Sequence, residues 1–440
     1  MVELLYLLLF ALVLVAARSE KNAYGTLLTP FCLISIPMLL ITGFLFFVAS
    51  AYDFPQVSLS LILCDYLFFA VFFLPSIVAR RFARREEDTG ILAAKSESDA
   101  QKWVMKRADA MMTVLVVFSF VWLVTYFISN ARSVSVLGSV VQTDFQAKYT
   151  GGFNFYPRIL CLAGAAYFIG TCGRGKYYKL LLAFIALVPL VLSLVKGIIF
   201  LPIIAGLILF CLINKIRIRI RKLIPIPILG VIIFFGVYMI ENGIWKISNI
   251  TTSDFYSFIF AKFNVYLVSG TESFNVNLIN GISYNEGILK SPAFAPVINL
   301  LAKFSLAEHV EGIGPVFTVL GYINGYGTAQ VNTDGFFGFI ALYTGFTTAV
   351  FFSFFFSCVS YLLFLRARNR TNIFYRLIYA MLAAGLFLGW FDYYFMQSFW
   401  YYLWIFFEIV AVFFEYAYYR QDFIRYPSIA GGRRRGPVRL

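Results

Sequence analysis

Long apolar runs recur along the chain and are separated by short polar or charged segments. Each run approaches the length of about 20 residues that an α-helix needs to cross a bilayer. The pattern therefore predicts an all-α, polytopic integral membrane protein with about eleven transmembrane helices. The predicted spans are residues 2–17, 27–49, 57–79, 110–129, 157–172, 180–195, 198–213, 223–240, 335–365, 373–391 and 398–419. Only Lys196 and Gly197 separate the sixth and seventh spans, so these two could instead form a re-entrant pair.

The polar segments divide the chain into four parts. Residues 1–240 carry the first eight spans, and residues 241–334 form a single outer loop of 94 residues. Residues 335–419 carry the last three spans, and residues 420–440 form a basic tail. The loop is not uniformly polar, because "DFYSFIFAKFNVYLVSG" (254–270) is amphipathic and aromatic. Such a segment favours helices that lie along the membrane interface.

Basic residues indicate the orientation of the predicted spans. If the N-terminus is outside, 28 of the 36 Lys and Arg residues fall on the inner side, as the positive-inside rule requires. An even number of spans would break this bias. We therefore expect an outer N-terminus, a cytoplasmic C-terminus and a first apolar run that is retained as a helix rather than cleaved.

Composition also supports a membrane protein and argues against several kinds of partner and site. Hydrophobic residues make up 61% of the chain and charged residues 13%, whereas soluble domains carry about 25% charged residues. The net charge of +14 lies mostly in the inner connections, so a nucleic-acid partner is not expected. The six cysteines form no CxxC pair, which argues against disulfides and a zinc site. A single histidine and the absence of a DxD cluster argue against a metal site.

The few outer cations are candidate binding residues. Arg158 stands at the outer end of the fifth predicted span, and Lys196 stands at the turn between the sixth and seventh. Each could simply reach lipid headgroups. Alternatively, the two could converge on a lipid-linked pyrophosphate and stabilise its developing charge when it leaves.

Several acids and the lone histidine are candidates for proton transfer. Asp334 joins the loop to the ninth predicted span in "NTDGFFGF", where it could cap the helix or remove a proton from a sugar hydroxyl. Glu272 and His309 lie in the same loop and are alternative bases. Asp65 and Glu408 lie inside predicted spans, where ionisable groups suggest a transporter or pairing within the bundle.

Tyrosines in the outer loop suit carbohydrate. "GYINGYGTAQ" places Tyr322 and Tyr326 among glycines and an asparagine. Aromatic rings stack on sugar faces, and hydroxyl and amide groups bind sugar hydroxyls.

These features together resemble the Wzy-type polymerases of O-antigen and capsular repeat units. The layout is similar, with one long outer loop before the last three spans. Three stretches are similar to the family's motifs: "LSLVKGIIFLPIIAGLILFCLINKIR", "VYLVSGTESFN" and "YINGYGTAQVNTDGFFGFIALYTGF". The family often has arginine where Lys196 stands, and lysine keeps the charge but loses the bidentate fork.

The resemblance implies a cofactor- and metal-independent glycosyltransferase of the GT-C class in the bacterial inner membrane. It would transfer a growing glycan from undecaprenyl pyrophosphate to an undecaprenyl-linked repeat unit at the periplasmic face. A flippase and a chain-length regulator would be its partners in the pathway. The implied roles are pyrophosphate binding by Arg158 and Lys196, assistance at the site mouth by Lys246 and Lys262, glycan contact by Tyr322 and Tyr326, and proton transfer by Asp334, Glu272 or His309.

Two alternatives remain open at this point. An O-antigen ligase-like enzyme resembles this layout and relies on an outer-loop histidine, which His309 could supply. A flippase or transporter of lipid-linked sugars would use charges inside the spans, for which Asp65 and Glu408 are the candidates.

Overall fold

The computed structural model places most of the chain in helices. It describes residues 1–83, 91–131, 148–173, 176–193, 196–214, 231–232, 235–236, 252–285, 287–310, 317–323, 327–370 and 372–425.

Most of the described elements are helices. The α-helices are α1 (Val2–Tyr24), α2 (Pro30–Ala51), α3 (Leu59–Ala83), α4 (Ile91–Ala131), α6 (Phe155–Thr171), α7 (Tyr178–Leu192), α8 (Lys196–Ile213), α10 (Thr252–Ile279), α11 (Ala295–Ala302), α12 (Gly335–Thr344), α13 (Phe346–Asn369), α14 (Ile373–Phe387) and α15 (Phe399–Arg425). The 3-10 helices are η2 (Gly152–Asn154), η4 (Ile288–Lys290), η5 (Pro292–Phe294) and η6 (Tyr394–Met396). The strands β1 (Thr318–Ile323) and β2 (Gly327–Val331) form an antiparallel pair with Thr318 opposite Val331.

Within the described residues, six helices are long and apolar enough to cross a membrane. They are Val2–Tyr24, Pro30–Ala51, Leu59–Ala83, Lys102–Asn130, Phe346–Asn369 and Phe399–Tyr418. The predicted membrane class agrees with this finding, whereas the count of eleven spans stays a prediction. Helices α7, α8 and α14 are apolar but shorter, and most of the predicted span 223–240 lies outside the described residues.

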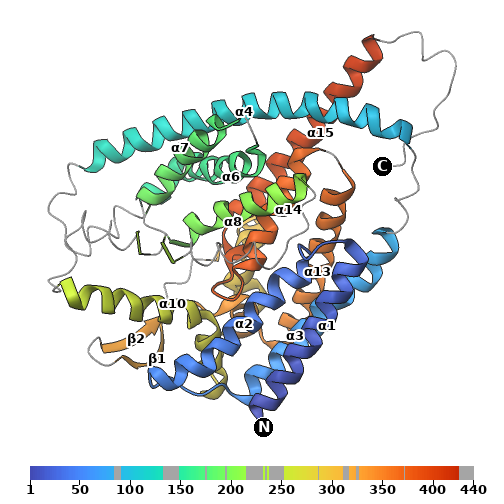
Figure 1. The fold of residues 1–440 in the computed structure, drawn as a ribbon. Coiled ribbons are helices and arrows are strands. Elements are labelled where there is room, and N and C mark those ends of the chain that lie inside the picture. The colour runs from blue at the N-terminus through green and yellow to red at the C-terminus, as the bar shows by residue number, and fades with distance from the viewer. Residues whose placement is uncertain are drawn as a thin grey trace.

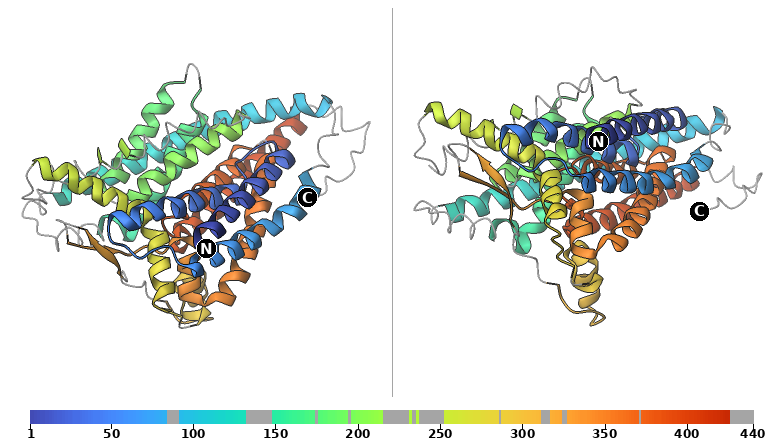
Figure 2. Two further views of the ribbon diagram at one scale, coloured as in Figure 1. Left: turned by 60° about the horizontal axis from the view of Figure 1, so that its bottom comes forward. Right: turned by 90° about the horizontal axis from the view of Figure 1, so that it is seen from below.

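Helix α14 forms the centre of the helical body (Figure 1). It packs against α8 and α6 on one side and against α2 and α13 on another. Its residues from Ile373 to Leu386 are buried all round, as a helix that is apolar on every face requires. Helices α4, α6, α7 and α8 pack together as one group, α3 packs against α1 and α13, and the β-hairpin packs beside α10 (Figures 1 and 2).

The predicted ninth span, 335–365, is two helices rather than one. Gly345 separates α12 from α13 and adopts φ +82°, a conformation that glycine tolerates and that ends a helix. The described residues between 335 and 425 therefore contain four α-helices, where the apolar pattern predicts three.

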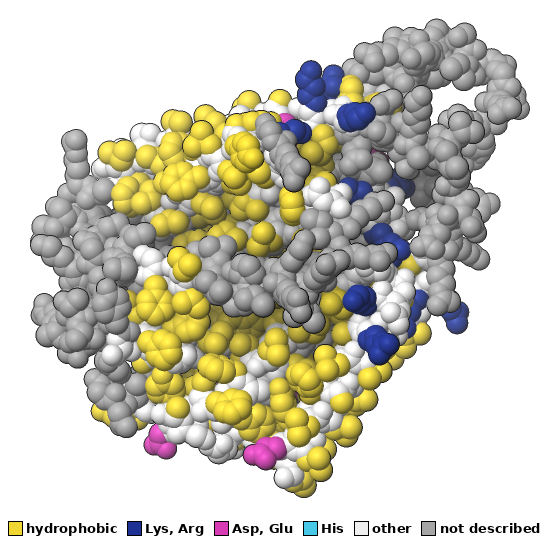
Figure 3. All heavy atoms as spheres, viewed as in Figure 1, with side chains coloured by type: hydrophobic (Ala, Val, Ile, Leu, Met, Phe, Trp, Pro, Cys, Tyr) yellow, Lys and Arg dark blue, Asp and Glu magenta, His cyan; other side chains and the backbone are white. Residues whose placement is uncertain are grey.

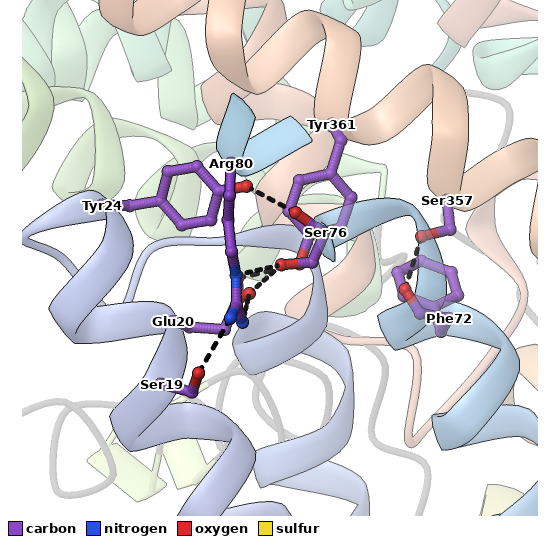
Figure 4. A network of polar contacts seen from close by, with 8 residues as sticks. All are labelled: Ser19, Glu20, Tyr24, Phe72, Ser76, Arg80, Ser357 and Tyr361. Atoms are coloured by element: carbon purple, nitrogen blue, oxygen red, sulfur yellow. Dashed lines mark hydrogen bonds and ion pairs between the residues drawn. The ribbon is translucent and has the colours of Figure 1, made fainter. Parts of the chain in front are cut away.

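A buried polar network marks one end of the bundle (Figure 4). The carboxylate of Glu20 in α1 accepts hydrogen bonds from the Tyr361 hydroxyl of α13 at 2.8 Å and from Arg80 of α3 at 3.1 Å. The Ser76 hydroxyl of α3 also donates to it. The predicted inner segments 18–26 and 80–109 thus meet at this end, and Lys and Arg gather on one side of the otherwise largely apolar face in Figure 3.

Candidate functional site

Asp334 is held by helix α10 and does not cap α12. Its carboxylate accepts hydrogen bonds from the Ser273 hydroxyl at 2.6 Å and from the Asn277 amide at 3.2 Å. Asp334 makes no side-chain cap bond to α12. Instead, the N–H of Phe336 in the first turn donates to the carbonyl of Gly389 at 2.6 Å. The interpretation of Asp334 as a helix cap is therefore wrong, and its carboxylate is available for another role.

One stripe of α10 supplies the partners of this segment. Ser269, Ser273 and Asn277 are buried and recur every four residues, so they share one helix face. The Thr333 hydroxyl donates to the Ser269 hydroxyl at 3.0 Å. Thr333 immediately precedes Asp334, which accepts from the other two residues of the stripe. Thr333 and Asp334 satisfy most of this polar stripe, whereas the side-chain oxygen of Asn277 is buried without a hydrogen-bond partner among the described residues.

Glu272 lies on a different side of α10. The Asn275 side chain accepts from the N–H of Ser58 at 3.0 Å and donates to the carbonyl of Gln56 at 3.1 Å. It also donates to Glu272 at 3.1 Å. The other Glu272 oxygen is buried without a hydrogen-bond partner among the described residues. Burial raises the pKa of Glu272 to about 8, so the group is mainly a neutral acid at pH 7, and it is Asn275 that joins α10 to the α2–α3 connection.

A segment between α14 and α15 closes the site from the other side. Gly270 of α10 lies against the carbonyl oxygens of Trp390 and Phe391, and a methyl group there would stand only 2.5 Å from the Trp390 oxygen. This close approach brings Asp392 to the site. Asp392 is partly exposed, and its carboxylate accepts from the N–H of Tyr393 at 2.7 Å.

Asp334 and Asp392, here called the acid pair, are related by the charge of Asp334, which acts on Asp392. Burial raises the pKa of Asp334, against the opposing effect of the bonds from Ser273 and Asn277. Burial, reinforced by the charge of Asp334, raises the pKa of Asp392 to about 7. The buried Asp334 is thus fixed in place by α10, whereas Asp392 is partly exposed. Two acids with shifted pKa values are a frequent mark of functional sites.

The sequence interpretation missed Asp392 and the α10 stripe. Asp392 is a single acid in the short aromatic connection "WFDYYF", and nothing local distinguishes it. A usable signal existed for the stripe, because Ser269, Ser273 and Asn277 have helical spacing in "SGTESFNVN". The structure also corrects the environment of residues 264–277, which pack within the bundle against α2, α3 and α12.

The predicted pyrophosphate residues Arg158 and Lys196 lie at the starts of α6 and α8. Arg158 is buried in the first turn of α6, where the rings of Phe155 and Tyr156 contact Tyr402 of α15. No ion pair in the described part of the chain involves Arg158. Lys196 begins α8, and its side chain lies outside the described residues.

The start of α8 touches the segment that carries Asp392. A methyl group on Gly197 would overlap the Tyr394 hydroxyl, two residues after Asp392. The backbone at Lys196 is therefore close to the 389–394 segment, although the sequence separates the two by almost 200 residues.

The remaining predicted site residues are not joined to the acid pair. His309 and Tyr322 are exposed, and no hydrogen bond, ion pair or ring contact among described residues links either one to Asp334. Lys262 lies on α10 with its ammonium 5.5 Å from the Phe258 ring centre. Lys246 and Tyr326 lie outside the described residues. In the described ranges, no three His, Cys, Asp or Glu residues form a group that could hold a metal.

Glu272→Gln should flatten the dependence of stability on pH. The native pKa of about 8 exceeds the ordinary value of 4.5, so the unfolded state releases this proton at lower pH. The contribution of the neutral Glu272 carboxyl to the free energy of unfolding is fully present below about pH 4.5. It is lost as the pH rises towards about 8. Thermal unfolding scans between these limits should show a smaller decline in Tm for Glu272→Gln than for the natural chain. The matched control is Glu308→Gln, at an exposed position, and parallel profiles for all three proteins would contradict the prediction.

Comparison with protein-family models matches residues 31–423 to a family of unknown function. No curated protein and no solved structure matches the chain.

Proposed function

The chain belongs to the family of unknown function DUF6337, and we propose from its site that it is a membrane glycosyltransferase. The proposed reaction transfers a glycan from undecaprenyl pyrophosphate to a hydroxyl of an undecaprenyl-linked repeat unit, on the side where the acid pair lies. The observation that carries the proposal is the acid pair: the buried Asp334 carboxylate is fixed by Ser273 and Asn277, and the chain after it bonds to Gly389 in the segment that leads to the partly exposed Asp392.

The position of the pair within the bundle supports the proposal. Ser58, which contacts Asn275 of α10, immediately precedes α3, whereas Arg80 of the basic network lies near the other end of that helix. The acid pair and the basic network thus lie at opposite ends. If the basic end is cytoplasmic, the acid pair lies towards the outer face. A transferase that uses lipid-linked sugars on the outer face requires its site there.

The reaction assigns a role to each charged group. The acid pair accepts the proton of the attacking hydroxyl, whose oxygen forms a new bond to the anomeric carbon of the donor. The bond from that carbon to the pyrophosphate oxygen breaks, and the bonding electrons leave with undecaprenyl pyrophosphate. Arg158 and Lys196 stabilise the charge of this leaving group.

The partners of the two acids inside the predicted spans favour a glycosyltransferase over a transporter. Glu408 forms an ion pair with Arg366, and Asp65 accepts a hydrogen bond from the Thr42 hydroxyl at 3.4 Å. Both acids therefore have partners within the helical bundle, so neither needs a transported ligand to account for it.

The test is reconstitution with purified lipid-linked repeat units, without nucleotide sugar and with a metal chelator present. A ladder of products is expected. Arg158→Ala and Lys196→Ala should each slow its formation on the order of 10²-fold, whereas Lys148→Ala, which removes an exposed cation, should not. His309→Ala should also leave the ladder unchanged.

Other outcomes separate the alternatives. A single transfer to a lipid A core acceptor, lost in His309→Ala, would indicate a ligase instead of a polymerase. A complete ladder from both cation variants would refute the pyrophosphate roles, and the absence of any glycan transfer would refute the proposed function.

A further inference from the structure

Residues 288–306 expose many large apolar side chains although they belong to none of the six candidate spans. Six of them, here called the apolar patch, range in exposure from 44% for Val297 to 73% for Leu306. The other members are Ile288, Leu289, Leu300 and Phe304. Such a concentration outside the spans would be unfavourable in water and indicates an interaction surface.

The segment that carries the apolar patch is structurally fixed. The Asn299 side chain accepts from the N–H of Val310 at 2.8 Å and donates to its carbonyl at 3.0 Å, so the chain after α11 folds back onto the helix. Ile298 points inward and is buried, whereas Val297 and Leu300 are exposed. Helix α11 is therefore apolar on its exposed side as well as on its buried side.

Contacts place this segment beside the starts of two candidate spans. The Phe294 ring lies 5.0 Å from that of Phe352 in the second turn of α13. The Lys303 ammonium donates to the Tyr402 hydroxyl in the first turn of α15 at 3.5 Å. The segment thus lies across the end of the bundle, at the level where α13 and α15 would enter a bilayer.

Charge around the apolar patch is complementary to lipid phosphate. Residues 288–306 contain two lysines and no acid. Lys290 and Lys303 are both exposed and stand on either side of α11. Exposed apolar side chains with flanking cations are typical of elements that lie in the interface of an anionic leaflet.

We propose that residues 288–306 insert the apolar patch into the lipid leaflet at the starts of α13 and α15, with Lys290 and Lys303 at the phosphate level. This assigns an interfacial position to residues 288–306, whereas the second half of the 254–270 segment, which the sequence pattern favoured, packs within the bundle. The inference concerns membrane contact alone and does not depend on the proposed reaction.

The experiment uses an environment-sensitive NBD label on a single accessible cysteine at Leu300→Cys, with the buried Cys32, Cys64 and Cys161 retained. The label is introduced after replacement of the partly exposed Cys172, Cys211 and Cys358 by serine. The full chain is reconstituted in vesicles of phosphatidylglycerol and phosphatidylethanolamine. The matched control is Glu308→Cys, at an exposed polar position beyond the apolar patch. A second label, at Phe304→Cys, keeps the test valid if the first variant does not fold.

The expected result is a blue-shifted emission at position 300, quenching by lipids brominated near the headgroup end of the acyl chain, and several-fold weaker quenching by aqueous iodide than at position 308. Equal iodide quenching at both positions, without quenching by brominated lipid, would overturn the proposal. Protection from both quenchers would also overturn it, because a second copy or another protein would then cover the apolar patch.

Discussion

Asp334→Asn should reduce glycan transfer on the order of 10²- to 10⁴-fold while leaving the fold intact. The loss is that expected when a group that participates in proton transfer is removed. The fold should persist because the asparagine carbonyl oxygen can still accept from Ser273 and Asn277, as the carboxylate does at 2.6 and 3.2 Å. The measurement is the rate of ladder formation together with the Tm of the purified variant.

A change in the pH profile distinguishes this role from a structural one. The charge of Asp334 contributes to the raised pKa of Asp392, so removal of that charge should lower the pKa of Asp392. Because activity declines as Asp392 is protonated, the acid limb of the residual activity should move to lower pH. Asp334→Ala is the structural control, since it leaves Ser273 and Asn277 without their acceptor and should cost about 1–3 kcal/mol of stability. Unreduced transfer by Asp334→Asn would exclude Asp334 from proton transfer.

Gly270→Ala should move the segment that carries Asp392 away from α10. The added methyl group would overlap the carbonyl oxygens of Trp390 and Phe391, and backbone atoms cannot rotate away as side chains do. We expect a loss of about 3 kcal/mol of stability and a marked loss of transfer, because Asp392 would move away from Asp334. Thermal unfolding and ladder formation measure the two effects.

Gly173→Ala provides the matched control for that prediction. A methyl group at Gly173 meets no atom within 4 Å, so the same chemical change should have little effect there. If the Tm and activity of Gly270→Ala and Gly173→Ala were equal, the close approach of the 389–392 segment to α10 would not be needed for function.

Local sequence patterns were sufficient for the class of the protein and for many of its helices. The predicted spans 2–17, 27–49 and 57–79 fall on α1, α2 and α3, because a long apolar run has few stable alternatives to a buried or lipid-facing helix. Asp334 and Glu272 were also identified as candidates, since acids at the ends of apolar runs are conspicuous.

The same patterns were insufficient wherever a distant partner decides the outcome. The apolar run 335–365 is continuous in composition, yet Gly345 at φ +82° divides it. The amphipathic pattern of 254–270 favoured an interfacial helix, yet the second half of α10 is buried. Its polar side chains meet Gln56 and Ser58 on one side and Thr333 and Asp334 on another.

The sequence by itself determined that the chain is an apolar, helical protein suited to a membrane, because hydrophobicity is a property of each residue and its near neighbours. Only the tertiary structure decided that Asp334 bonds to α10 instead of capping α12, and that Asp392 joins it. Those contacts connect residues about 60 positions apart in the chain, and hydrogen bonds over such separations depend on how the helices pack. The candidate site is therefore a product of packing, and its chemistry rests on groups that no single stretch of sequence brings together.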